Sequence, residues 1–286
     1  MNNFTQRALT ASVFVVVLLG AIIFNQYTFY SLFVLITTLG ILEFYRLTTD
    51  EINRPQRYFG TFITISLFII SNLYVMRGIN PAWYLVLISL IFPMFIFELY
   101  TKSKMPFNNI ALTLTGIFYV GVPFAMLNGI AYPGIKAGTG EWTGTIIPTS
   151  DYNPHILLGM IFMIWANDTG AYLIGSKFGK HKLFERISPG KTWEGSFGGA
   201  FFAVLIAFII SIYFKDIELM DWMIISSIVI VFGTLGDLVK SLLKRSIGVK
   251  DSGTILPGHG GILDRFDSII MASPFVLLYI VLRFHI

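Results

Sequence analysis

The stretch GDLVKSLLKRSIGVKDSGTILPGHGGILDRFDS, residues 236–268, gathers charge, glycine and a histidine between two long apolar runs. The run before it begins near Trp222, and the run after it continues to Phe284. About 20 apolar residues are enough for a helix to cross ~30 Å of hydrocarbon. We therefore predict that this polar stretch connects two transmembrane helices and that the rest of the chain is organised around it.

The two halves of the stretch have different local patterns. Asp237, Lys240, Ser241 and Lys244 are spaced i, i+3, i+4 and i+7, so a helix would place them on one face. Farther on, four glycines and Pro257 interrupt helical periodicity and leave backbone N–H groups available. The sequence thus predicts a charged helical stripe followed by a glycine-rich loop.

Carboxylates, clustered cations and a glycine-rich turn together suit a polyphosphate bound with a metal ion. Mg²⁺ takes one or two carboxylates beside water and phosphate oxygens, while lysine, arginine and bare amides bind the remaining charge. An ordinary cytoplasmic loop, whose basic residues follow membrane topology, is the simpler explanation of a lone Lys-Arg pair. It does not explain the whole stretch.

The stretch resembles the signature of the phosphatidate cytidylyltransferase (CDP-diacylglycerol synthase) family. The matching pattern reads S-x-x-K-R, a gap, K-D, a short loop, P-x-H-G-G and x-D-R-x-D. Its residues here are Ser241, Lys244, Arg245, Lys250, Asp251, Pro257, His259, Gly260, Gly261, Asp264, Arg265 and Asp267. The match is specific, but it covers only about a tenth of the chain.

Composition independently indicates an integral membrane protein. The chain is 55% hydrophobic and 13% charged with a mean hydropathy of +0.73, whereas soluble domains are about 25% charged. The absence of cysteine excludes disulfides and thiolate metal sites. We predict an all-α polytopic bundle of about nine transmembrane helices. Their predicted ranges are Leu9–Phe24, Phe29–Leu47, Phe59–Val75, Ala82–Tyr100, Asn109–Tyr132, Ile156–Gly175, Gly195–Phe214, Trp222–Leu243 and Ile262–Phe284.

The distribution of basic residues predicts the orientation. With the N-terminus cytoplasmic and the C-terminus outside, sixteen of the twenty lysines and arginines face the cytoplasm, which the positive-inside rule favours. Residues 1–150 then hold about five spans and an external loop, and residues 151–286 hold about four spans with a catalytic region facing the cytoplasm. The net charge of +4 needs no nucleic-acid partner, because anionic membrane lipids are natural neighbours of such a face.

A second polar cluster, SPGKTWEG at residues 188–195, precedes the seventh predicted span. Ser188 is expected as a helix cap with Pro189 at the first helical position. That interpretation leaves Lys191, Thr192 and Glu194 unexplained. The cluster is also similar to a second stretch of the cytidylyltransferase family, and the predicted topology puts it on the same membrane face as the signature.

Three acidic residues outside the two polar clusters lie within predicted spans. Asp168, after Asn167, is costly inside a membrane and therefore suggests function; a structural ion pair is the alternative, and the resemblance, which includes this Asn-Asp pair, favours function. Glu43 and Glu98 are each followed one helical turn later by a basic residue, Arg46 and Lys102 respectively. Local ion pairing therefore accounts for them, and we assign them no role.

The resemblance implies condensation of CTP with phosphatidate to give CDP-diacylglycerol and pyrophosphate. A phosphomonoester has a second pKa of about 6, so the attacking oxygen is already ionised and needs no protein base. Positioning and charge neutralisation remain for the protein and its cations. The resemblance also implies a multi-pass protein of the bacterial plasma membrane with a cytoplasmic active site, and it leaves a homodimer open.

Residue roles follow from the same resemblance. Asp237 and Asp264 are expected to hold Mg²⁺, with a second cation left open. His259 would hydrogen-bond a phosphate oxygen, or else only pack the loop. The expected catalytic residues are Lys244, Arg245, Lys250, Asp251, His259, Arg265 and Asp267. The expected substrate-binding residues are Asn167, Asp168, Ser188, Lys191, Thr192, Glu194, Lys240 and Ser241.

Two other classes of membrane protein share some of these features. A secondary transporter would also bury charges in broken helices, but it would show paired interruptions in two halves of the chain. Here the polar elements are confined to the second half. A CDP-alcohol phosphatidyltransferase would carry D-G-x-x-A-R followed by aspartates on the same helix, and the sequence contains no such string.

Overall fold

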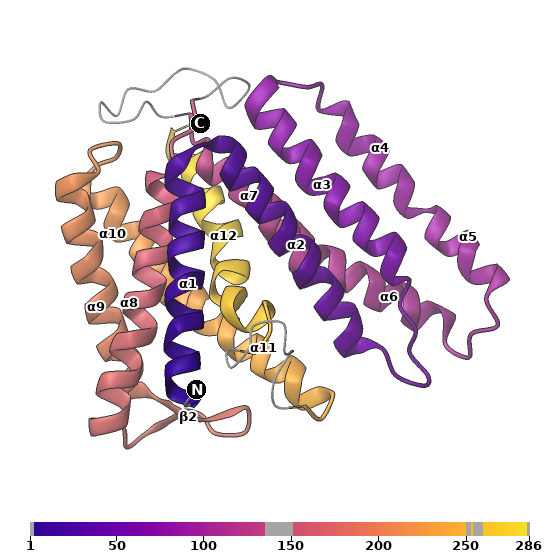
Figure 1. Ribbon diagram of the computed structural model, residues 1–286. Coiled ribbons are helices and arrows are strands. Elements are labelled where there is room, and N and C mark those ends of the chain that lie inside the picture. The colour runs from indigo at the N-terminus through magenta and orange to yellow at the C-terminus, as the bar shows by residue number, and fades with distance from the viewer. Residues whose placement is uncertain (1–2, 135–150, 250–252, 254–259, 285–286) are drawn as a thin grey trace. The chain divides into compact units, whose positions relative to one another are not determined.

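The computed structural model describes residues 3–134, 151–249, 253 and 260–284 (Figure 1). Its described residues form two compact units. The first runs to Gly129 and also includes the described residues between Val249 and Arg265. The second comprises the described residues from Ile130 to Gly248 and the chain from Phe266. The boundary therefore falls inside the last helix.

The named elements of the first unit, in the part that the structure describes, are all helices. Its elements are α1 (Asn3–Phe24), α2 (Gln26–Thr48), α3 (Arg57–Arg77), α4 (Ala82–Ile91), α5 (Pro93–Tyr100), α6 (Pro106–Gly116), the π-helix η1 (Ile117–Gly121) and α7 (Val122–Ala131). Asn25 caps α2, since its side chain accepts hydrogen bonds from the N–H groups of Tyr27 and Thr28. Pro93 lacks an N–H group, which explains the break between α4 and α5.

The second unit combines helices with one short hairpin. Its elements are α8 (His155–Phe178), β1 (Lys182–Phe184), β2 (Ser188–Thr192), α9 (Trp193–Tyr213), α10 (Leu219–Ile228), the π-helix η2 (Val229–Gly233), α11 (Thr234–Ser246) and, from Phe266 onward, α12 (Leu263–Phe284). The strands are antiparallel, with Lys182 opposite Thr192 and Phe184 opposite Ser188. Helix α8 packs along α9.

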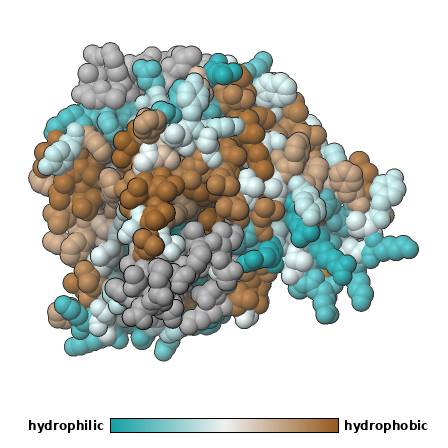
Figure 2. Space-filling view, in the orientation of Figure 1, coloured by the Kyte–Doolittle hydropathy of each residue, from teal (hydrophilic) through white to brown (hydrophobic). Residues whose placement is uncertain are grey.

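The predicted all-α membrane architecture is confirmed for the described residues. Eight helical segments are long and apolar enough to span a membrane, and they correspond to the second to ninth predicted runs. The first run is also helical, within α1, but its apolar part is the shorter Leu9–Phe24. That α1 crosses the membrane therefore stays a prediction. On the face shown in Figure 2, hydrophobic residues cover much of the helices.

The entry into α9 corrects one prediction. Ser188 does not cap a helix and Pro189 does not begin one, because residues 188–192 form strand β2. Thr192 is the cap, and its side chain accepts a hydrogen bond from the Gly195 N–H at 3.2 Å. As a strand, residues 188–192 pair with β1 through the backbone, which a helix beginning at Pro189 would not do.

Buried polar contacts join the helices within each unit. In the first unit, the Tyr45 hydroxyl donates to the Thr113 carbonyl at 2.8 Å, and the Asn72 amide donates to Asn128 at 3.1 Å. In the second, the fully buried Trp222 occupies the space that the missing side chain of Gly159 leaves on α8. Polar groups at membrane depth need such internal partners, since lipid offers none.

Candidate active site

Helix α11 presents the predicted charged stripe. The Lys240 ammonium lies 2.8 Å from the Asp237 carboxylate on the same helix and 2.5 Å from the Asp267 carboxylate on α12. The Lys240 and Asp267 side chains are 9% and 11% exposed, so this ion pair is nearly buried. One lysine therefore bridges two carboxylates that stand 30 residues apart in the chain.

The hairpin contributes a second lysine to the same group. Lys191 on β2 places its ammonium 2.6 Å from the other oxygen of Asp237. The second polar cluster of the sequence thus meets the signature helix directly. Both side chains are about a quarter exposed, which leaves them open to solvent or to a ligand.

Helix α8 brings Asp168 to this group, where it interacts electrostatically with Lys191, Asp237 and Lys240. We call Asp168, Lys191, Asp237, Lys240 and Asp267 the charged cluster. Its three carboxylates and two ammonium groups carry a formal charge of −1. A cation or an additional basic residue would therefore be required before the cluster could accept a polyphosphate.

Close packing of α8 against α9 fixes the position of the Asp168 turn. Asn167 is buried, and a Cβ atom added to Gly199 would lie only 2.7 Å from its side-chain oxygen. Any larger residue at position 199 would push α8 away from α9. In the structure Asn167 therefore positions a helix, while its predicted role in substrate binding stays a prediction.

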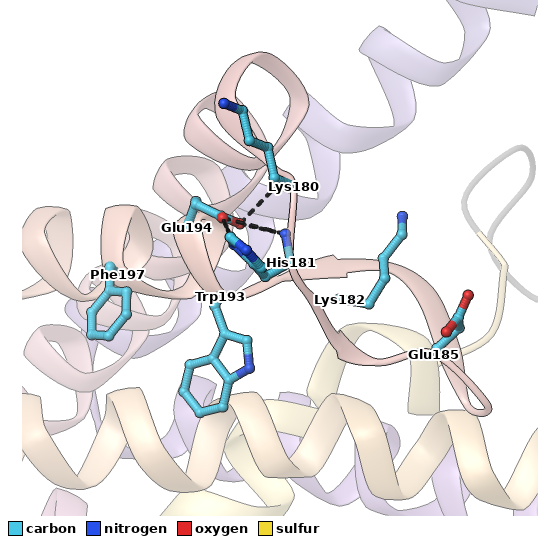
Figure 3. Close-up of a pocket in the computed structure, with 7 residues that line it drawn as sticks. All are labelled: Lys180, His181, Lys182, Glu185, Trp193, Glu194 and Phe197. Carbon is cyan, nitrogen blue, oxygen red and sulfur yellow. Dashed lines mark hydrogen bonds and ion pairs between the residues drawn. The ribbon is translucent and has the colours of Figure 1, made fainter.

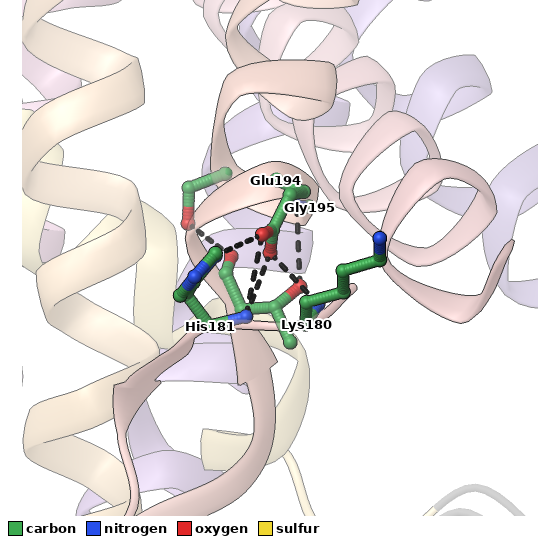
Figure 4. A network of polar contacts seen from close by, with 6 residues as sticks. Lys180, His181, Glu194 and Gly195 are labelled. Carbon is green, nitrogen blue, oxygen red and sulfur yellow. Dashed lines mark hydrogen bonds and ion pairs between the residues drawn. The ribbon is translucent and has the colours of Figure 1, made fainter. Parts of the chain in front are cut away.

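Glu194, predicted to bind substrate, is directed toward the start of the hairpin (Figure 4). Its carboxylate accepts hydrogen bonds from the backbone N–H groups of Lys180 and His181 at 3.1 and 3.2 Å. The His181 ring nitrogen Nδ1 lies 2.6 Å from the same carboxylate. Glu194 therefore ties the first turn of α9 to the end of α8 and holds the hairpin in place.

A pocket of about 740 Å³ opens beside this contact (Figure 3). Lys180, Lys182 and Glu185 line it together with His181, Glu194 and two aromatic residues of α9, Trp193 and Phe197. In Figure 3 Lys180 and Trp193 extend to opposite sides of the Glu194–His181 pair. The pocket thus has a charged side and an aromatic side, as expected where polar and apolar surroundings meet.

The end of the signature is held by a residue to which we assigned no role. Glu43 of α2 is 2% exposed, and its carboxylate accepts hydrogen bonds from the N–H groups of Ile262 and Leu263 at 2.8 and 3.2 Å. A Cβ on Gly261 would clash with this carboxylate, which explains a glycine there. The local ion pair predicted for Glu43 is therefore wrong as an account of its role, because Glu43 anchors the start of α12.

Glu98 likewise departs from the prediction. Its buried carboxylate accepts hydrogen bonds from Gln56 Nε2 at 2.9 Å and from the Thr101 hydroxyl at 2.7 Å. Neutral donors therefore satisfy it in place of Lys102. An acidic residue inside an apolar run was the available signal for Glu43 and Glu98, but their distant partners could not be identified from one sequence.

The remaining predicted residues lie at the end of α11, at the start of α12 or outside the described residues. Ser241, Lys244 and Arg245 lie in the last turns of α11, and Arg265 is exposed in the first turn of α12. Asp264 accepts a hydrogen bond from the Gly261 N–H at 3.3 Å, next to Gly260, which has a φ of +84°. Lys250, Asp251 and His259 lie outside the described residues.

The metal prediction stays a prediction. Asp264 belongs to the first unit and Asp237 to the second, so a shared ion between them is not tested. Within the described ranges no three His, Asp or Glu side chains are arranged so that together they could hold one metal ion. Mg²⁺ does not require such a group, because it is commonly bound by one or two carboxylates together with phosphate oxygens.

Comparison with known proteins identifies the family. The sequence profile of the cytidylyltransferase family matches residues 5–283. Phosphatidate cytidylyltransferases of Staphylococcus aureus (strain COL) and Staphylococcus haemolyticus are 37% and 36% identical to the chain over 197 residues, which is 68% of each protein. The corresponding protein of Staphylococcus saprophyticus is 38% identical over the same length. Given a profile match over nearly the whole chain, this protein belongs to the cytidylyltransferase family.

Proposed function

We propose that the chain is a phosphatidate cytidylyltransferase that condenses CTP with phosphatidate to give CDP-diacylglycerol and pyrophosphate. The observation that carries the proposal is the contact of Lys191 with Asp237. It joins the two stretches of sequence that resemble the family, and it places them beside Lys240 and Asp267. The named relatives support the same reaction.

The reaction is an in-line displacement at the α-phosphorus of CTP. An oxygen of the phosphatidate monoester forms the new P–O bond, and the bond to the β-phosphate oxygen breaks, so that pyrophosphate leaves with the electron pair. The nucleophile is already ionised near neutral pH. The protein therefore has to align the phosphatidate phosphate, the α-phosphate of CTP and the leaving pyrophosphate, and it has to reduce the repulsion between their negative charges.

Lys191 and Lys240 are positioned for this task. Each ammonium group now donates to Asp237, and an ammonium keeps three donors that rotate about a flexible stem. Phosphate oxygens could replace carboxylate oxygens as acceptors without moving the helices. Lys244, Arg245 and Arg265 supply further positive charge at the ends of α11 and α12.

Asp237 is the member of the charged cluster that suits a divalent cation, because its carboxylate is partly exposed and the cluster carries a net negative charge. Mg²⁺ binds one or two such carboxylates together with phosphate oxygens. We propose Asp237 as one ligand and Asp264 as the other candidate. When bound, Mg²⁺ would act as a Lewis acid that neutralises the charge of the triphosphate.

The site is proposed to face the cytoplasm of a bacterial plasma membrane. Phosphatidate would enter from the bilayer, because each acyl CH₂ exposed to water costs about 0.8 kcal/mol. The pocket between the hairpin and α9 supports lateral entry, since Trp193 and Phe197 give it an apolar side. We therefore place the lipid headgroup near the hairpin.

The test is pyrophosphate release by the purified full-length chain in detergent micelles, where no transmembrane gradient exists. Release should require both CTP and phosphatidate, and should stop with chelator and resume with Mg²⁺. Asp237→Asn should lower turnover by about 100-fold or more, because it removes charge without changing shape. Lys215→Gln serves as the control, since Lys215 is exposed just beyond the other end of α9.

Lys244 gives a graded version of the test. Lys244→Gln should lower turnover, and Lys244→Arg should restore it only in part, because a planar fork replaces a compact ammonium. A folded wild-type chain that releases no pyrophosphate under these conditions would refute the proposed function. Substrate-dependent flux of a soluble anion across vesicles would indicate a transporter instead.

A further inference from the structure

A second pocket lies in the first unit and is lined by none of the residues assigned above to catalysis. It has a volume of about 580 Å³ and is formed where α3 begins and α5 ends. Its lining residues include Arg54, Arg57, Tyr58, Phe59, Phe97 and Thr101. We propose that this pocket binds the phosphate headgroup of an anionic phospholipid from the surrounding bilayer.

The pocket lies at the depth of lipid headgroups. Arg57 is the first residue of one spanning helix and Tyr100 is the last residue of another, so both mark a boundary of the hydrocarbon. Lys102 and Lys104 follow directly in the chain. Hydrophilic residues also gather at the end of this unit, where the α2–α3 and α5–α6 connections lie (lower right in Figures 1 and 2). Basic pockets between helices at this depth bind acidic headgroups.

The charge of the pocket favours an anion. Arg54 and Arg57 are exposed, and they carry the only charged side chains among the described residues that line it. Glu98, which accepts hydrogen bonds from the lining residues Thr101 and Gln56, is 6% exposed. The Asp50 carboxylate, in the same α2–α3 connection, accepts hydrogen bonds from the N–H groups of Ile52 and Asn53. Two guanidinium groups can bind one phosphate through paired N–H donors.

The walls of the pocket are held in place before any ligand binds. Gln56 Nε2 donates to the Met94 carbonyl as well as to Glu98, which ties the start of α3 to α5. Arg57 lies 4.6 Å over the Tyr58 ring and donates to the Tyr58 hydroxyl at 2.8 Å. Less ordering is therefore required when a ligand arrives.

The aromatic side of the pocket distinguishes a lipid from a soluble anion. Phe59 of α3 and Phe97 of α5 contact each other edge to face at 5.6 Å between ring centroids. Their apolar surface suits the glycerol backbone and the first methylene groups of an acyl chain. Inorganic phosphate or a nucleotide could use the arginines, but it would gain nothing from the phenylalanines.

Lipid binding by the full-length chain tests the proposal. The probe is dioleoyl phosphatidylglycerol, with dioleoyl phosphatidylcholine and inorganic phosphate as comparisons, and bound lipid is counted by native mass spectrometry. Arg54→Gln with Arg57→Gln should weaken the tightest phosphatidylglycerol site about thirty-fold, at about 1 kcal/mol per arginine. The matched control is Arg77→Gln, an exposed arginine at the other end of α3, which should change nothing.

The double Arg→Lys variant covers the possibility that loss of charge disturbs folding. It keeps the charge but loses the bidentate fork, so its affinity should fall between those of the wild type and the Gln variant. Unchanged phosphatidylglycerol binding in a folded Arg54→Gln, Arg57→Gln chain would overturn the proposal. Displacement of the lipid by millimolar inorganic phosphate would also overturn it, because a soluble anion would then be the ligand.

Discussion

Replacement of Glu43 by glutamine should destabilise the protein although size and shape are kept. The carboxylate accepts N–H groups from Ile262 and Leu263, and at 2% exposure it has almost no access to water. Glutamine offers one acceptor oxygen, and its amide nitrogen would face the other N–H group. One hydrogen bond to a charged group is lost and one donor is left buried, which costs about 2–3 kcal/mol in the free energy of unfolding.

The expected change in melting temperature follows from the length of the chain. For 150–250 residues, 1 kcal/mol corresponds to about 2–4 °C, and a longer chain lies at the low end of that range. Glu43→Gln should therefore melt roughly 5 °C lower. The measurement is loss of the monodisperse peak on size-exclusion chromatography after heating in detergent.

Glu98→Gln is the matched control for Glu43→Gln. Glu98 is also buried, but it is bonded to a glutamine amide and a threonine hydroxyl, both of which can reorient toward a new partner. We expect a cost below about 1 kcal/mol there. If Glu98→Gln lowered the melting temperature as much as Glu43→Gln, the anchoring role of Glu43 would be refuted.

Three further predictions concern the second unit and the topology. Lys240→Met should cost about 3–5 kcal/mol and should be partly rescued by Asp267→Asn, because it leaves nearly buried carboxylates unpaired; equal melting temperatures for the single and double variants would contradict this. Gly236→Ala should destabilise despite the better helix propensity of alanine, because the new Cβ would lie 2.9 Å from Met271 Cβ, whereas Gly20→Ala in open space should be neutral or stabilising. Since the chain has no cysteine, Lys182→Cys and Ser246→Cys should react with an impermeant thiol reagent only from the cytoplasm, and Lys215→Cys only from outside; the reverse pattern would invert the predicted orientation.

The sequence was sufficient for the helices because membrane spans depend on local properties. Apolar length alone located the runs, and the spacing of Asp237 and Lys240 predicted their shared face. The π-helices at Ile117–Gly121 and Val229–Gly233 were not predicted, because an i→i+5 turn leaves the average hydropathy of a run unchanged.

The contacts between distant segments could not be predicted in the same way. The pairing of Glu43 with Ile262, of Lys191 with Asp237 and of Lys240 with Asp267 each depends on which helices become neighbours. Apolar length and helical periodicity do not indicate which helices become neighbours. The hairpin was not predicted because the Ser-Pro pair is also typical of a helix start. The contacts that accompany the strand, which are the Thr192 cap and the hydrogen bond from the Lys180 N–H group to Glu194, could not be identified from the pattern alone.

The hydrogen bonds of Glu43 have a consequence for biosynthesis. The carboxylate and its partner N–H at Ile262 are separated by 219 residues, and ribosomes add about 5–20 residues per second. Roughly 10–45 s must therefore pass between synthesis of the acidic residue and arrival of its partner. During that interval the second helix carries an acidic group for which the growing chain has not yet supplied its final donors. The hydrogen bonds that hold the start of α12 can therefore form only when translation is nearly complete.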